Sequence, residues 1–216
     1  MKKIYFNTET IVNDQKLLRD LFDSDSIYLS ALSSISFSGE ISLGSNISFA
    51  GECVLKSGCI VDDGSIVSNA TFGINCHIRP YSLIYDMQSG SGNIFGPFCF
   101  IRDKTRVKNN SILGAYTEIV RSNISSNVKI SHQSFIADAD IGDDAIIGAG
   151  VVFCNFNGTK KCTSVVEHNV TIGAGTLVIS PVVIGNFSIV AAGSVVNKDI
   201  KPNKKFIQKR VSLEIQ

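Results

Sequence analysis

A six-residue repeat runs through most of this chain, and it limits the possible folds more than any other feature. Each copy opens with an aliphatic or aromatic residue, often continues with glycine or another small residue, and has a small fifth residue. Clear copies lie at 37–42, 43–48, 49–54, 55–60, 61–66, 72–77, 78–83, 95–100, 101–106, 107–112, 113–118, 141–146, 147–152, 172–177, 184–189 and 190–195. Such hexads are typical of a parallel β-helix, a triangular prism with about 18 residues per coil. The sequence therefore predicts an all-β solenoid over 37–200.

The repeat also accounts for most of the cysteines. The first residue of a hexad points into the prism and stacks on its copy one coil away, while the fifth points inward near a corner with little room. Cys53, Cys59, Cys76 and Cys99 all occupy the fifth place. We therefore expect these four residues to be small buried hydrophobic groups rather than metal ligands, redox groups or disulfide partners.

Two segments fall outside the repeat. Residues 1–36 predict a small α+β N-terminal cap over the first coil, with a strand over 3–6, a helix over 14–22 and a strand over 26–29. Residues 201–216 form a basic, alternating C-terminal arm, for which a solvated terminal strand and a functional role are equally open. The expected organisation is a cap over 1–36, a β-helix over 37–200 and an arm over 201–216.

Composition excludes several functional classes. The net charge of +1 gives no basic surface for nucleic acid. No apolar run approaches the roughly 20 residues of a membrane span, and the start of the chain lacks the apolar core of a signal peptide. We therefore expect a cytoplasmic protein without nucleic-acid or membrane partners. The histidines His77, His132 and His168 lie too far apart for a grouped zinc site, so no metal is expected.

Chemistry is expected where the repeat breaks, because the coils themselves are scaffold. The largest break in the second half follows Phe153, where 154–162 contains Asn157-Gly158 and predicts an extruded loop. His132 stands in the third, outward-facing place of the hexad 130–135, and small residues over 138–150 keep the neighbouring wall low. Periodicity alone leaves His132 open as either a catalytic or a merely solvated histidine.

The stretch from Phe95 to Arg210 resembles a known enzyme. The shared residues are Gly96-Pro97-Phe98, Ile101-Arg102, Glu118, His132, Asp138-Ala139-Asp140-Ile141-Gly142-Asp143, Ile147-Gly148-Ala149-Gly150, Cys154-Asn155-Phe156-Asn157-Gly158, Lys161, Pro181-Val182-Val183-Ile184-Gly185 and Ala191-Ala192-Gly193. They are similar to the acetyltransferase domain of the bifunctional glucosamine-1-phosphate acetyltransferase / N-acetylglucosamine-1-phosphate uridylyltransferase, a hexapeptide-repeat acyltransferase. Residues 1–36 are too few for its uridylyltransferase domain.

The resemblance implies a homotrimer of left-handed β-helices that transfers acetyl from acetyl-CoA to the amine of an amino sugar. It implies that His132 is the general base, because an imidazole can accept a proton near neutral pH. Glu118 would hold the imidazole, and Asn155 would steady the amine or thioester. The cofactor side would comprise Ala149, Lys161, Ala174, Ala192 and, after a one-residue shift, Arg210. Arg102 would grip a sugar phosphate.

The acceptor side departs from the family pattern. The lysine that partners the arginine in the family is Val120 here, although Arg121 is adjacent. Phe135 and Phe156 stand where the family has tyrosine, and Ile146 stands where it has asparagine. Ala174 replaces a serine of the cofactor wall. These changes make the acceptor side more apolar, so the donor side has the stronger sequence support.

The combined expectation is a trimeric acetyl-CoA-dependent N-acetyltransferase. Its acceptor would be a small amino sugar, either as a sugar phosphate or linked to a nucleotide, for a surface polysaccharide. Two alternatives remain at this point: a sugar O-acetyltransferase with the same base, and a non-catalytic trimeric β-helix that serves as a scaffold or binding protein.

Overall fold

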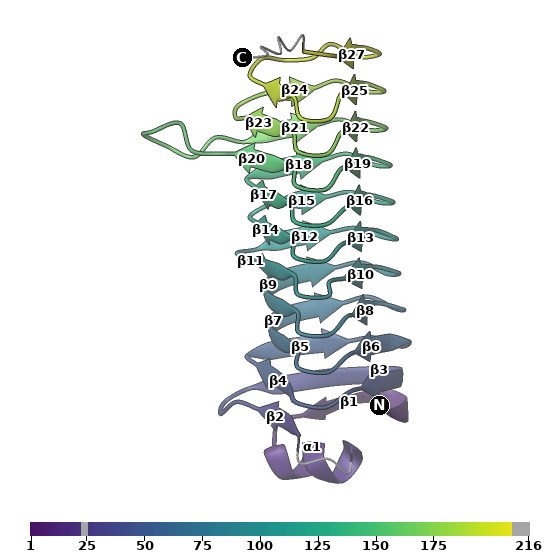
Figure 1. Cartoon of the computed structure of the whole chain (residues 1–216). Helices are drawn as coiled ribbons and strands as arrows, with labels where there is room; N and C mark the ends of the chain where they lie inside the picture. Colours follow the sequence, from purple (N-terminus) through teal and green to yellow (C-terminus); the bar gives the residue numbers. More distant parts are fainter. Residues whose placement is uncertain (23–25, 209–216) are drawn as a thin grey trace, which may run out of the picture.

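The structure, a computed structural model, describes residues 1–22 and 26–208. Among these residues, 27 strands join one continuous sheet that winds around a left-handed prism, with one short helix at the N-terminal end (Figure 1). The all-β solenoid predicted from the hexads is therefore confirmed.

Three flat faces, named here A, B and C in the order in which the chain visits them, make up the prism. Face A contains β5 (Glu52–Leu55), β12 (Thr105–Val107), β15 (Asn123–Ile124), β18 (Ala139–Ile141), β21 (Ser164–Val166) and β24 (Val183–Ile184). Face B contains β6 (Cys59–Val61), β8 (His77–Ile78), β10 (Ile94–Phe95), β13 (Ile112–Leu113), β16 (Lys129–Ile130), β19 (Ile146–Ile147), β22 (Thr171–Ile172), β25 (Ile189–Val190) and β27 (Lys205–Phe206). Face C contains β2 (Ile27–Leu29), β4 (Ile47–Ala50), β11 (Phe100–Arg102), β14 (Glu118–Val120), β17 (Phe135–Ala137), β20 (Val152–Cys154), β23 (Leu177–Ile179) and β26 (Val195–Val196).

Three longer strands continue around a corner in the N-terminal half. β3 (Ser34–Leu43) runs from face A to face B, while β7 (Ile66–Phe72) and β9 (Leu83–Ser89) run from face C to face A. Within each face the strands pair in parallel and in register, so equivalent hexad positions of successive coils lie directly above one another. The prism therefore converts sequence periodicity into straight columns of side chains.

The N-terminal segment differs in detail from the expected one. β1 (Lys2–Val12) is longer than the strand expected over 3–6, and it pairs antiparallel with β3. Helix α1 (Gln15–Phe22) begins one residue later than expected, because Asp14 is its N-cap and accepts a hydrogen bond from the backbone N–H of Leu17 at 3.0 Å. β2 already pairs in parallel with β4, so the first rung of the prism precedes residue 37.

The open end of the first coil is closed by aromatic packing. Phe22 of α1 is fully buried, and its ring centroid lies 5.5 Å from that of Phe37 and 6.4 Å from that of Phe6. Phe6 in turn stacks on Phe37 at 5.2 Å. These contacts shield the hydrophobic interior from water, which a solenoid requires at its ends. The division of the chain into segments 1–36, 37–200 and 201–216 stays a prediction.

The interior consists of stacked hexad residues. Cys53, Cys59, Cys76 and Cys99 are free thiols buried inside the prism, in agreement with the prediction from the fifth hexad position. Burial raises the pKa of the Cys99 thiol to about 11, which keeps it in the unreactive thiol form. Where the fifth residue is Thr117, its hydroxyl donates a hydrogen bond to the backbone oxygen of Gly114 at 2.8 Å, so the polar group is satisfied inside the core.

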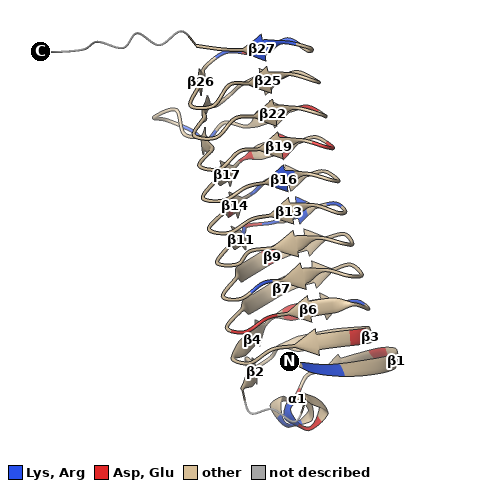
Figure 2. Ribbon diagram, turned by 45° about the vertical axis from the view of Figure 1, so that its right-hand side comes forward, with Lys and Arg blue, Asp and Glu red and all other residues tan. Residues whose placement is uncertain are grey.

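The outer surface carries both signs of charge. Lysine and arginine positions are interspersed with aspartate and glutamate positions along the prism (Figure 2). Within the described residues, no helix combines the length and the apolar character needed to cross a bilayer.

Candidate active site

His132 lies at the corner between faces B and C, named here the B–C corner. Among the described residues, nine coils place a two-residue turn there, and the second residue of each turn has a positive φ of 55–70°. The turns are linked by hydrogen bonds from that second residue to the first residue of the preceding turn: Gly64 to Ser45, Tyr81 to Asp63, Phe98 to Pro80, Tyr116 to Pro97, Gln133 to Ala115, Gly150 to His132, Gly175 to Ala149 and Gly193 to Ala174. Ala149 and Ala174 therefore stand in one column with His132, and Ala192 is the first residue of the next turn.

His132 occupies the sixth of these turns, between β16 and β17. Its backbone oxygen accepts the N–H of Gly150 at 2.9 Å, which fixes the turn against the following coil. The side chain is exposed, and the imidazole forms no hydrogen bond with the described part of the chain. The ring is therefore available to a ligand that lies along the corner.

The three turns immediately before His132 carry large aromatic residues. The rings of Tyr81, Phe98 and Tyr116 stack nearly parallel, with centroid distances of 5.4 and 5.1 Å and interplanar angles of 7° and 4°. Each ring remains exposed at its edge. Ring–ring stacking offsets the cost of holding three bulky residues at positive φ, and it fills this half of the corner with side chains.

The turns after His132 carry only alanine and glycine. A Cβ added at Gly150 would approach nothing nearer than 3.9 Å, so packing within the protomer does not demand glycine there. Gly148, just before the turn, is different, because its Cβ would lie 2.5 Å from the backbone nitrogen of Ala174. The corner beyond His132 is therefore a low wall along which a ligand can approach the backbone closely.

A chain of charged side chains, named here the arginine ladder, follows the neighbouring corner between faces C and A. Arg102 donates to Glu118 Oε1 from Nε (3.3 Å) and Nη2 (2.9 Å), and from Nη1 to Asp103 at 2.6 Å. Arg121 donates to the same Asp103 at 3.0 Å. Arg121 also holds both oxygens of Asp138, at 2.7 and 3.0 Å. The ladder thus joins Glu118, Arg102, Asp103, Arg121 and Asp138 across three successive coils.

Asn155 extends the ladder into the fourth coil. Its Nδ2 donates to Asp138 Oδ2 at 2.5 Å. The hydrogen bonds from Arg121, together with that from Asn155, hold the pKa of the Asp138 carboxyl below its ordinary value of 3.8. The hydrogen bonds to Asp138 in turn raise the pKa of the Arg121 guanidinium, so Arg121 and Asp138 both stay charged at neutral pH. Asn155 is therefore positioned by an ion pair on the two preceding coils.

Two expected contacts of the acceptor lie on different faces. Phe135 is on face C, directly beside Glu118 in the register and half-buried. Ile146 is on face B, exposed, between Lys129 and Thr171. A single protomer therefore does not bring Ile146 and Phe135 to one surface.

The residues of the expected loop lie in one segment that leaves the prism. The segment 155–163 projects from the prism after β20 (Figure 1), and Phe156 and Lys161 form an antiparallel bridge across it. Phe156 is 60% exposed, and the charge of Lys161 contributes to the lowered pKa of Asp138. Arg210 lies outside the described residues.

Sequence reasoning missed the acidic partners of the two arginines. Asp103 and Asp138 follow their strands at the same corner, 35 residues apart in sequence. Only the stacking of coils brings Asp103, Arg121 and Asp138 together. Writing the hexads in register would have placed these three residues in one column.

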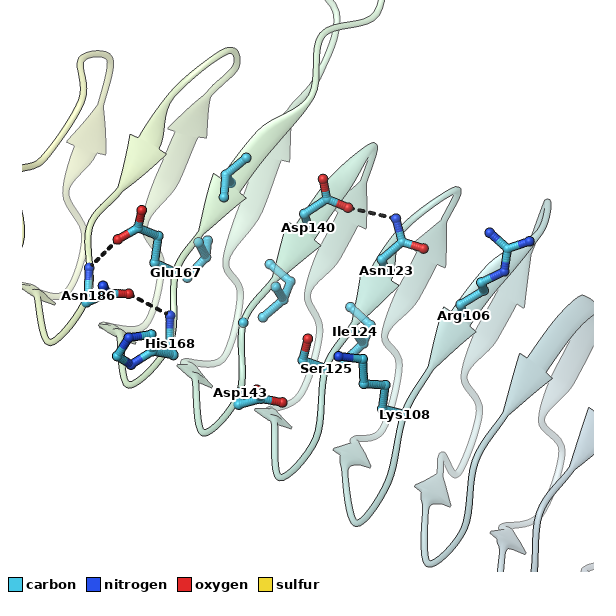
Figure 3. Close-up of a pocket in the computed structure, with 14 residues that line it drawn as sticks. Arg106, Lys108, Asn123, Ile124, Ser125, Asp140, Asp143, Glu167, His168 and Asn186 are labelled. Carbon is cyan, nitrogen blue, oxygen red and sulfur yellow. Dashed lines mark hydrogen bonds between the residues drawn. The ribbon is translucent and has the colours of Figure 1, made fainter.

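A groove of about 700 Å³ lies on face A, away from the B–C corner (Figure 3). Arg106 and Lys108 line one end, while Asp140, Glu167 and His168 lie toward the other. Hydrogen bonds inside the groove join Asn123 to Asp140 and Glu167 to Asn186 (Figure 3). None of the residues expected to act in catalysis or cofactor binding lines this groove. His168 instead packs edge-on against Phe187 at 5.0 Å.

The stacked hexads and the single left-handed prism define the class of the protein as a hexapeptide-repeat β-helix. The UDP-N-acetylglucosamine acyltransferase of Arabidopsis has this fold, with a TM-score of 0.68 and 22% identity over 82% of this chain and 67% of that one. No model of a known protein family matches the chain.

The sequence likeness is more specific than the fold. The chain is 34% identical to the bifunctional protein GlmU of Wigglesworthia glossinidia brevipalpis over 85% of its own length and 41% of the relative. It is 33% identical to GlmU of Baumannia cicadellinicola over 88% of its length and 38% of the relative. The chain thus spans about two fifths of the curated relatives that it matches. The resemblance read from the motifs is confirmed by this match.

Proposed function

We propose that the protein is an acetyl-CoA-dependent N-acetyltransferase of an amino sugar, with His132 as general base. The observation that carries the proposal is the position of His132. Its unoccupied imidazole stands at the end of the aromatic half of the B–C corner and at the start of the alanine–glycine wall formed by Ala149, Ala174 and Ala192. A long, thin cofactor on that wall would bring its reactive end to the imidazole.

The chemistry needs one proton acceptor. The imidazole of His132 takes a proton from the sugar amine as its nitrogen attacks the thioester carbonyl. The new C–N bond forms, the C–S bond breaks, and the proton passes to the departing CoA thiolate. The proposed transfer is direct, from acetyl-CoA to the amine, without an acyl-enzyme.

Two side chains support this base in the proposal. Both hydrogen bonds from Arg102 go to Oε1 of Glu118, which leaves Oε2 for the imidazole. The amide nitrogen of Asn155 is engaged by Asp138, which leaves its Oδ1 for the acceptor amine. Lys161 and Arg210 would contact the CoA phosphates, while Phe135, Ile146 and Phe156 would line the acceptor site.

The proposal includes a homotrimer, because Ile146 and Phe135 lie on different faces and would meet only across neighbouring prisms. A column of outward-facing residues on face C supports such packing. In register, it comprises Ile66, Leu83, Phe100, Glu118, Phe135, Val152, Leu177 and Val195. Seven of these eight are apolar, whereas the central part of the corresponding column on face A is polar (Thr71, Gln88, Arg106, Asn123 and Asp140). Packing face C against a second copy would remove this apolar column from water.

Sedimentation tests the assembly. We expect a single trimeric species at micromolar concentration, and a monomer would contradict a site shared between prisms. Replacing Leu83, one of the apolar residues of the face C column, with aspartate should shift the protein toward monomer. The matched change Gln88→Asp on face A should leave the trimer intact.

The activity test is acetyl-CoA consumption against a panel of amino sugars, their 1-phosphates, their nucleotide-linked forms and the corresponding hydroxyl sugars. We expect thiol release with at least one amine acceptor. Release only with hydroxyl sugars would establish O-acetylation instead. Absence of CoA binding in calorimetry would indicate a scaffold or binding protein. The cytoplasmic location stays a prediction.

A further inference from the structure

Both arginines of the arginine ladder donate to carboxylates from all three of their guanidinium nitrogens. Arg102 gives Nε and Nη2 to Glu118 and Nη1 to Asp103. Arg121 donates hydrogen bonds from Nε and Nη2 to Asp138 and from Nη1 to Asp103. Every guanidinium nitrogen of the two residues therefore already donates to an anion. A phosphate placed here would share each guanidinium with carboxylates that are already bound to it.

The charges of the ladder do not favour a phosphate either. Two guanidinium groups face the three carboxylates of Asp103, Glu118 and Asp138, so the ladder carries a net charge of −1. The ladder is half exposed rather than buried, with 33% of the Arg102 side chain and 41% of the Asp103 side chain accessible. A ligand can therefore reach it, and it meets three carboxylates there beside the two guanidinium groups, with the charge of Lys161 acting on Asp138. The carboxylates repel a phosphate dianion, whereas they do not repel a neutral or cationic sugar.

Asp103 is the one group that both arginines share. It follows β11 at the corner with a φ of 59°, and Oδ2 accepts Arg102 at 2.6 Å and Arg121 at 3.0 Å. Glu118 and Asp138 each serve a single arginine. Removing the charge of Asp103 alone would change the net charge of the ladder from −1 to zero. It would also weaken the hydrogen bond that Nη1 of each arginine donates to this residue.

We propose that Asp103 is a specificity-determining residue that excludes a phosphate from the acceptor site. The inference rests on the proposed acetyl transfer, and it narrows the acceptor to an amino sugar without a phosphate at the end that contacts Arg102. The family resemblance gives Arg102 the opposite role, as a grip for a sugar phosphate. In this chain Arg102 and Arg121 instead form ion pairs with three carboxylates, and Asp103 is the carboxylate that joins the two arginines.

The test compares glucosamine with glucosamine 1-phosphate, which differ only in the phosphate. Binding of each to the protein saturated with CoA is measured by calorimetry for the wild type, Asp103→Asn and Asp103→Gly. Asparagine and glycine both accept positive φ, so neither substitution strains the turn. Thermal melting verifies that each variant is folded. The control is Asp144→Asn, because Asp144 is also exposed and also has a φ of 59° but lies at another corner.

We expect Asp103→Asn to bind glucosamine 1-phosphate at least about tenfold more tightly than the wild type, since a charge-assisted hydrogen bond contributes about that factor. Asp103→Gly should gain as much or more. Glucosamine affinity should change less than about twofold in both, and Asp144→Asn should match the wild type. A gain below twofold for the phosphate ester, or an equal gain for both sugars, would overturn the proposal. The binding readout needs no turnover, so failure of acetyl transfer to every amine would count against the proposed function alone.

Discussion

The two halves of the B–C corner use the same backbone for opposite purposes. Both are built from turns with positive φ that are linked coil to coil by the same hydrogen bond. Before His132 the turns carry Tyr81, Phe98 and Tyr116, whose rings stack on one another. After it the turns carry glycine preceded by alanine. A repeat scaffold can therefore close or open a groove by changing side chains at one position, without any change of fold.

The difference between the two halves of the corner also bears on the position of His132. On the N-terminal side, its corner is occupied by Tyr116, and on the C-terminal side, by Ala149 and Gly150. A ligand that enters along the low wall would end at His132, because the aromatic rings block further travel. The position of the catalytic base is thus expected at the junction of the two halves rather than inside either one.

Filling the open half should produce the largest effect on the cofactor. Ala174→Tyr places a large ring on the alanine–glycine wall and should weaken CoA binding by about tenfold to a hundredfold, since overpacking a contact costs about 1–3 kcal/mol. Calorimetry with CoA measures the change. Tyr116→Ala, which removes a ring from the closed half, should leave CoA affinity unchanged. Equal losses in both variants would mean that the two halves do not differ in function.

Breaking the aromatic stack should affect stability rather than binding. Phe98 is the middle ring and contacts both Tyr81 and Tyr116. Phe98→Ala should lower the free energy of unfolding by about 1–2 kcal/mol, because two stacked pairs are lost. Urea unfolding at fixed protein concentration gives the value. Phe156→Ala removes an exposed loop ring without a ring partner, and it should fall within about 0.5 kcal/mol of the wild type.

The smallest effect should come from the arginine ladder, and it should depend on pH. The pKa of Asp138 is lowered by Arg121, so the ionised carboxylate stabilises the folded state at neutral pH. That stabilisation is present above the ordinary pKa of 3.8 and is lost as the pH falls through the lower folded value. Asp138→Asn should therefore cost about 1 kcal/mol at pH 7 and nothing at the acid end. A penalty that stays constant below pH 3.8 would assign the effect to packing instead.

The hexads predicted the prism and the buried cysteines because both depend on local periodicity. They also placed His132 on an outward position, since the third place of a hexad always faces solvent. They did not predict the length of β1, whose antiparallel pairing with β3 follows no six-residue pattern. The contacts of Asp103 were also missed, because its two arginine partners become neighbours only when the hexads are written in register. His132, Asn155 and the cofactor residues stay predictions.

The most direct test of the central claim is the turnover of His132→Ala with acetyl-CoA and the best amine acceptor of the panel. We expect turnover to fall by a factor on the order of 100 to 10,000, the range for a positioned acid–base group, while CoA affinity stays within about twofold. His168→Ala, an exposed histidine at another corner, should retain wild-type turnover. Near wild-type turnover of His132→Ala at saturating substrate would contradict the assignment of His132 as the general base.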